Sequence, residues 1–331
     1  IIVSIDRPLH ELSTLIESDT DEFVRWDAAQ ELAKKILTIK MQGQDVEDAL
    51  GIYISSLRSV FETAHDKPAE TALILNIPSE SVVASNLPII DPDAIYQARN
   101  WIKDVLLESF DQEFQALYEA FKIEGPYEPS YKDISARSLR NVALSYLVRD
   151  PNGKGLARAL SLYCGADNLT DQWAALKCLN NFDCKEREHA LSSFSAIHKD
   201  PLVLDKWLAL EATSSINGTL NRVKALLKHP EYDSKNPNRI RALIGSFAHS
   251  NSILFHHKTG QGYDFIASQI LEIDAFNPQI AARLTSSFQK WARYDHERKD
   301  LMEQHLLSIK GHRGLSADVR EIVEKTLEVY A

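Results

Sequence analysis

The segments Asn277-Pro278-Gln279-Ile280-Ala281-Ala282-Arg283 and Asn236-Pro237-Asn238-Arg239-Ile240-Arg241 carry the same signals for the start of an α-helix. In each segment Asn stands at the capping position and Pro at the first helical position, where its missing N–H costs nothing. The helix after Asn277 places Ile280, Leu284 and Phe288 on one stripe and polar side chains on the other. Both segments therefore predict amphipathic helices that bury one face.

Similar signals continue along the chain, and only 12 of the 331 residues are glycine. Asp19 with Glu22 predicts the start of a helix, and five apolar side chains cluster on one face of it. These are Phe23, Trp26, Leu32, Ile36 and Leu37. Helix-length segments alternate with short polar turns, at a spacing close to the ~40 residues of an armadillo or HEAT repeat. Stacked helix pairs bury faces that one pair leaves exposed. We predict an all-α fold, a right-handed α-solenoid of armadillo/HEAT-like helix pairs forming a bowl.

Two other features bear on the organisation of the chain. Residues 1–8 predict the remnant of a preceding β domain, because Ile1 to Ile5 alternate like a strand before Pro8 ends the pattern. Residues 9–331 are predicted to form the helical domain, with a sub-boundary near 124–131. Asn152-Gly153-Lys154-Gly155 predicts a turn, because the full phosphate-loop pattern is absent and no strand precedes it.

Composition narrows the classes of partner. The net charge of −10 argues against nucleic acid, which requires a basic surface. No run of about 20 apolar residues is present, so no membrane span is expected. The three cysteines are an odd number without a Cys-x-x-Cys pair. This count indicates free thiols in a reducing compartment, which we expect to be the cytoplasm.

Gln279 and Arg283 lie four residues apart and should point to the same side of their helix. Arg offers a planar fork of donors, and Gln offers a donor and an acceptor. The pair could hold a carboxylate or a peptide carbonyl. The alternative is an ordinary solvated helix face, which the spacing alone favours.

Longer strings resemble one family over almost the whole chain. They are Phe23–Gln30 (FVRWDAAQ), Ser138–Ala143 (SLRNVA), Asn168–Leu176 (NLTDQWAAL), Asn236–Asn251 (NPNRIRALIGSFAHSN) and Asn277–Leu284 (NPQIAARL). Together they resemble the C-terminal helical domain of aminopeptidase N, a gluzincin zinc metallopeptidase family, in its bacterial alanyl-aminopeptidase branch. The resemblance implies a helical bowl that closes over a catalytic domain.

The family's catalytic motif is missing. His-Glu-x-x-His binds zinc through its two histidines and uses the glutamate as a general base. His10-Glu11 and His296-Glu297 are the two His-Glu pairs, and neither has a second histidine at the required position. We therefore expect no zinc and no catalysis in this chain, with zinc held by the catalytic domain of a longer parent enzyme.

The resemblance also implies partners and site residues. The partners would be the catalytic and β domains of the same polypeptide and the peptide substrates. Gln279, Arg283 and, with less support, Arg241 are implied to contact substrate in the chamber that this domain encloses and gates. Two alternatives stay open. One is an armadillo-like interaction scaffold without an enzymatic parent, and the other is a self-sufficient hydrolase, which no nucleophile–base pair supports.

Overall fold

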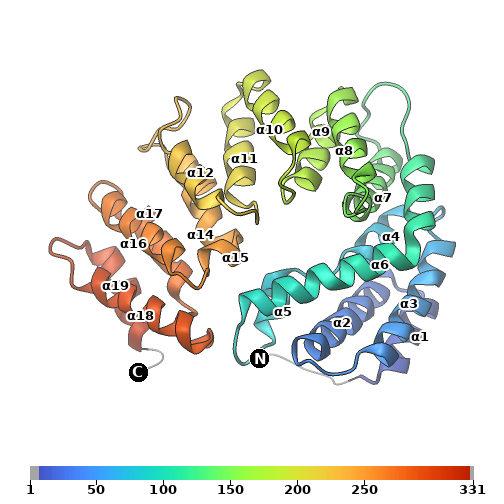
Figure 1. Ribbon diagram of the computed structural model, residues 1–331, viewed down its shortest axis with the longest axis horizontal. Helices are drawn as coiled ribbons and strands as arrows, with labels where there is room; N and C mark the ends of the chain where they lie inside the picture. The colour runs from blue at the N-terminus through green and yellow to red at the C-terminus, as the bar shows by residue number, and fades with distance from the viewer. Residues whose placement is uncertain (1–6, 329–331) are drawn as a thin grey trace. The chain divides into compact units, whose positions relative to one another are not determined.

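The computed structural model describes residues 7–328, and every regular element in that range is helical (Figure 1). The all-α prediction is therefore confirmed. Residues 1–6 of the predicted β remnant lie outside the described residues. The α-helices are α1 (Leu9–Ser18), α2 (Glu22–Met41), α3 (Glu47–Glu62), α4 (Pro68–Leu75), α5 (Glu80–Ser85), α6 (Pro92–Ala120), α7 (Tyr131–Leu147), α8 (Lys154–Gly165), α9 (Leu169–Leu179), α10 (Lys185–Ile197), α11 (Pro201–Ala212), α12 (Thr219–Leu226), α13 (Pro237–Ile240), α14 (Ser246–Ser250), α15 (Ser252–Phe255), α16 (Gln261–Asp274), α17 (Pro278–Thr285), α18 (His296–Lys310) and α19 (Ala317–Glu328).

The chain divides into two compact units. The first contains the described part of Ile1–Asn86 together with Ala94–Leu179. The second contains Leu87–Asp93 and the described part of Asn180–Ala331. The predicted sub-boundary near 124–131 lies inside the first unit and stays a prediction.

The helices of the first unit pack on one another, both between neighbours in the chain and across longer separations. Helix α1 packs on α2 and α3, α4 packs on α7, and α8 packs on α9 (Figure 1). In α2, Leu32, Ile36 and Leu37 are fully buried, as their shared face predicts. Phe23 on the same predicted face is 67% exposed. The cap of this helix is Asp21, whose side chain accepts from the next backbone N–H groups, and not the predicted Asp19.

The turn between α7 and α8 brings two backbones into close contact. Gly153 begins α8 in the left-handed conformation, with φ of 74°, which glycine adopts without strain. Gly155, in the first turn of α8, is buried. A Cβ atom at position 155 would lie 1.8 Å from the carbonyl oxygen of Leu147. Only glycine fits there.

We expect Gly155→Ala to lower the free energy of unfolding by at least about 3 kcal/mol, because the new methyl group meets backbone that cannot move aside. Gly51→Ala is the matched control, since Gly51 is inside α3 with no atom within 4 Å of its Cβ position. Gly51→Ala should raise the free energy of unfolding by about 0.5–1 kcal/mol, because alanine has the higher helix propensity. Urea unfolding checks both values. A Gly155→Ala variant as stable as the wild type would show that the backbones of α7 and α8 are not in close contact at this position.

Two predicted helix starts are confirmed in the second unit. Asn236 Oδ1 accepts from the backbone N–H of Asn238 at 2.9 Å, and Asn277 Oδ1 accepts from that of Ile280 at 3.3 Å. The stripe after Asn277 is buried as predicted, since Ile280, Leu284 and Phe288 are at most 5% exposed. Helix α13 continues through a π-helical turn, Arg241–Gly245, into α14. Helix α17 packs on α16 and α19.

A buried histidine lies in the second unit between two tyrosines. His256 Nδ1 is 2.9 Å from the Tyr263 hydroxyl, and its Nε2 is 2.8 Å from the Tyr294 hydroxyl. Burial, with a smaller contribution from the Arg298 charge, lowers the pKa of His256 to about 3. The ring is therefore neutral in the folded protein at ordinary pH.

Acid should destabilise the protein through His256. The histidine pKa is near 6.5 when unfolded and lower when folded, so the unfolded state binds the extra proton and stability falls as pH drops below 6.5. Protonation of His256 in the unfolded state should lower the free energy of unfolding by about 2 kcal/mol between pH 7 and pH 5. His256→Gln should lack that part of the loss in urea unfolding, and His257→Gln, at an exposed ring, should keep it. Equal pH dependence in the wild type and His256→Gln would contradict the assignment.

Candidate functional site

Arg241 and Arg283 line one pocket of about 210 Å³ within the second unit. Arg241 begins the π-helical turn, and Arg283 projects from α17. The apolar side chains of Ile240, Ile280 and Leu284 also line the pocket. Gln279 is exposed and is not among the lining residues. The structure therefore brings two of the three predicted site residues together.

The pocket is electropositive. Arg241 Nη1 donates to Asn238 Oδ1 at 3.2 Å, a neutral partner that leaves the charge uncompensated. Within residues 7–328 no carboxylate pairs with the Arg283 guanidinium, and no acidic side chain lines the pocket. His249 lies beside Arg283, where desolvation and the Arg283 charge lower its pKa despite a hydrogen bond with the Arg283 backbone.

This chemistry suits one anionic or carbonyl group. Two guanidinium groups can donate several hydrogen bonds to a carboxylate or a peptide oxygen. The volume is below the roughly 300–1,000 Å³ of complete small-molecule sites. The pocket therefore fits one group of a larger ligand.

Arg239, two residues before Arg241, has a different role that the sequence analysis did not assign. The residue is 6% exposed, and its guanidinium pairs with Asp205. It also donates to the carbonyl oxygens of Pro201 at 2.8 Å and Glu231 at 3.0 Å. The signal that could have revealed it is spacing, because Arg239 lies four residues before the buried Leu243.

The two arginines should respond differently to truncation. Arg239→Ala should lower the free energy of unfolding by about 3 kcal/mol, because it leaves Asp205 and two carbonyls without their donor. Arg241→Ala should change it by less than about 0.5 kcal/mol, because the side chain is exposed. Chemical denaturation of both variants gives the comparison. A larger loss for Arg241→Ala would contradict the division of roles.

The described residues do not fit a zinc site. Among residues 7–328 no group of three or more His, Cys, Asp or Glu side chains is placed to hold a metal ion. His256, which is buried, has both ring nitrogens within hydrogen-bond distance of tyrosine hydroxyls.

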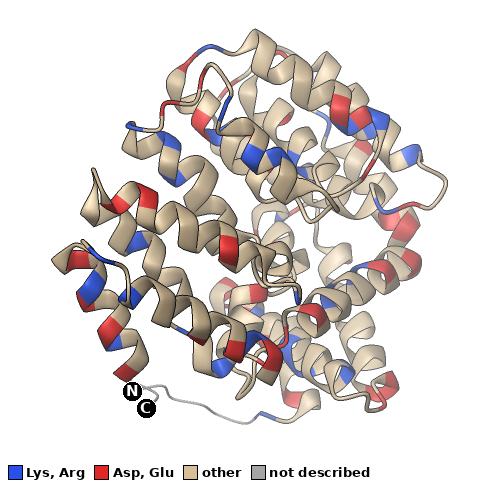
Figure 2. Ribbon diagram, turned by 60° about the vertical axis from the view of Figure 1, so that its left-hand side comes forward, with Lys and Arg blue, Asp and Glu red and all other residues tan. Residues whose placement is uncertain are grey.

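The charged residues of both signs are mixed along the helices, and Figure 2 shows Lys and Arg interspersed with Asp and Glu. In the described part of the chain, no helix is both long enough and apolar enough to cross a membrane.

Comparison with known proteins identifies the class. The family described as "Domain of unknown function (DUF3458_C) ARM repeats" matches residues 9–328, and the chain belongs to this family. The predicted armadillo-type repeat is thereby confirmed.

Particular relatives are aminopeptidases. The chain is 36% identical over 326 residues to Aminopeptidase N of Caulobacter vibrioides, and 33% identical over 330 residues to that of Haemophilus influenzae. It is 33% identical over 323 residues to Aminopeptidase N of Escherichia coli. These matches cover 98%, 98% and 96% of this chain. They span 38%, 37% and 37% of the relatives' own lengths.

A solved structure agrees. The crystal structure of Legionella pneumophila aminopeptidase A in complex with aspartic acid matches with a TM-score of 0.89 and 26% identity. The match covers 98% of this chain and 39% of that one. The predicted resemblance to the C-terminal helical domain of a bacterial aminopeptidase N is therefore confirmed.

Proposed function

We propose that the chain is the non-catalytic, substrate-channel domain of a zinc aminopeptidase that removes N-terminal residues from peptides. Its helix pairs would form a right-handed bowl that encloses the active-site chamber and limits the entry of peptides. The partners would be the catalytic and β domains of the same polypeptide, and the compartment would be the cytoplasm. Bond cleavage would be carried out by groups outside this chain.

The observation that carries the proposal is the pocket shared by Arg241 and Arg283. Both guanidinium groups lack a carboxylate partner among the described residues, so they are available to a ligand. The buried side chains of Ile280, Leu284 and, just after the helix, Phe288 fix the orientation of α17, from which Arg283 projects. Gln279 lies one turn before Arg283 on the exposed side of α17 and would contact a more distant part of the peptide.

The energetic value of these contacts depends on what covers the pocket. An exposed arginine pair contributes less than ~1 kcal/mol, because water screens the charge. A charge-assisted hydrogen bond in a closed chamber contributes roughly 1.5–3 kcal/mol. The proposal therefore requires that bound peptide or another domain exclude water from the pocket.

Arg283→Ala in the whole protein should raise KM for peptides about 10- to 100-fold, at ~1.4 kcal/mol per decade, and alter kcat less. Arg283→Lys should give an intermediate KM, because the charge remains and the planar fork is lost. Steady-state kinetics with peptides of several lengths measures both.

Arg320→Ala is the control, because Arg320 is exposed on α19 outside the pocket. It should leave KM unchanged. An unchanged KM in Arg283→Ala at every peptide length would remove Arg283 from the substrate site. Tight binding of a folded partner by the chain alone, without any effect of Arg283→Ala on peptide turnover, would favour the interaction scaffold.

A further inference from the structure

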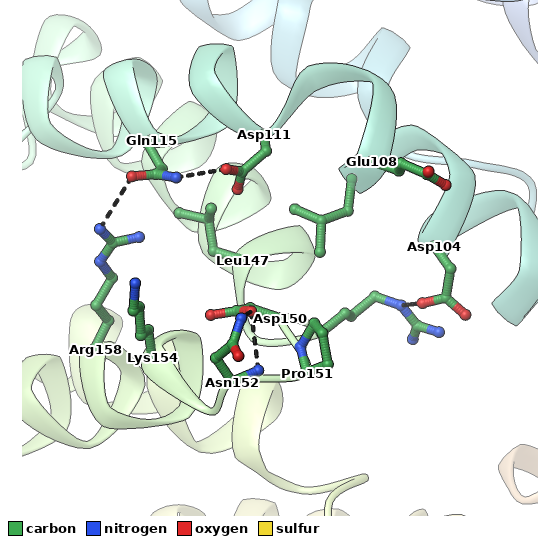
Figure 3. Close-up of a pocket in the computed structure, with 12 residues that line it drawn as sticks. Asp104, Glu108, Asp111, Gln115, Leu147, Asp150, Pro151, Asn152, Lys154 and Arg158 are labelled. Carbon is green, nitrogen blue, oxygen red and sulfur yellow. Dashed lines mark hydrogen bonds and ion pairs between the residues drawn. The ribbon is translucent and has the colours of Figure 1, made fainter.

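A second and larger pocket lies within the first unit, between α6 and the turn that joins α7 to α8 (Figure 3). Its volume is about 640 Å³, which is inside the range of complete small-molecule sites. Helix α6 departs from helical geometry at Phe110, and acidic side chains before and after this kink border the same pocket. Leu107 and Leu147 supply buried apolar surface at 8% and 2% exposure.

The pocket has sides of opposite charge. Asp104, Glu108 and Asp111 project from α6, and Lys154 and Arg158 project from the first two turns of α8. Figure 3 shows Lys154 and Arg158 together, below Gln115 and Asp111. A ligand with a single charge would meet attraction on one side and repulsion on the other.

An amide separates the opposite charges at one end of the pocket. Gln115 Nε2 donates to Asp111 Oδ2 at 2.7 Å, and Arg158 Nη2 donates to Gln115 Oε1 at 3.5 Å (Figure 3). Asp111 and Arg158 therefore each contact a neutral group instead of each other. Lys154 and Glu108 form no ion pair within residues 7–328.

At the other end of the pocket Arg149 and Asp104 form an ion pair, whereas Asp150 stays negatively charged. Arg149 Nε lies 2.7 Å from Asp104 Oδ1. Asp150 accepts from the backbone N–H of Asn152 at 3.0 Å, and this lowers the pKa of Asp150. Asp111 and Glu108 on α6 and Lys154 and Arg158 on α8 form no ion pair among the described residues and can face a ligand, and the Asp150 charge acts on Lys154.

We propose that this pocket binds a free α-amino acid with an aliphatic side chain. The carboxylate would face Lys154 and Arg158, and the ammonium group would face Asp111 and Glu108. The side chain would rest on Leu147 and Leu107. A zwitterion satisfies both sides at once, and charge-assisted hydrogen bonds are stronger than neutral ones. This site is separate from the Arg241–Arg283 pocket and does not rest on the proposed function.

Calorimetric titration of leucine into the full chain tests the proposal, with two analogues that each lack one charge. Isoamylamine lacks the carboxylate, and 4-methylpentanoate lacks the ammonium group. Leucine should bind saturably with a Kd on the order of 1 mM or below, and each analogue should bind at least about 10-fold more weakly. High salt should weaken leucine binding, because the charges are accessible to ions.

Variants locate the site. Lys154→Gln with Arg158→Gln, and separately Asp111→Asn, should each raise the Kd for leucine at least about 10-fold. Lys132→Gln is the control, because Lys132 is exposed on α7 and does not line the pocket. Circular dichroism verifies that every variant is folded.

Three results would overturn the proposal. They are the absence of saturable leucine binding, equal binding of leucine and its two analogues, and binding by folded variants that equals the wild type. Because the assay measures no peptidase activity, its outcome is independent of the Arg283 kinetics.

Discussion

The packing of these helices depends on buried arginines that supply donors to the ends of neighbouring helices. The last carbonyls of an α-helix have no partner within it, and burying one without a donor costs about 1–3 kcal/mol. The Nε of an arginine can donate to such a carbonyl while its terminal nitrogens reach a carboxylate. The arrangement occurs in both units. In the first unit Arg25 Nε donates to the Ile16 carbonyl at 2.8 Å, and the guanidinium pairs with Glu70. In the second unit Arg187 Nε donates to the Asn180 carbonyl at 3.0 Å and pairs with Glu211, and Arg298 Nε donates to the His256 carbonyl at 2.5 Å and pairs with Asp93.

We propose that the same residue type serves recognition where it is not buried. Arg239 is fixed by Asp205 and two carbonyls, and it holds the segment from which Arg241 projects. Arg241 and Arg283 then share a pocket without a carboxylate partner among the described residues. A backbone held in place by buried ion pairs adds little ordering cost when these guanidinium groups bind a peptide oxygen. This links the buried ion pairs to the proposed contact with substrate.

The sequence predicted the features that depend on neighbours in the chain. Caps at Asn236 and Asn277 and the stripe of α17 follow from local rules and were confirmed. Phe23 was assigned to a shared face but lies in the first turn of α2 and is 67% exposed. The segment around Lys154 was predicted as a turn, and nothing local showed that Lys154 and Asp111 line the same pocket. That arrangement depends on how α6 lies against the α7–α8 turn, which periodicity does not encode.

We propose that the Arg241–Arg283 pocket faces the peptide that a zinc aminopeptidase containing this chain would cleave. A crystal structure of the whole protein with a bound, non-hydrolysable peptide measures this directly. A peptide oxygen should lie within about 3.2 Å of an Arg283 guanidinium nitrogen. A peptide bound elsewhere, with Arg283 on the outer surface or covered by another domain, would contradict it.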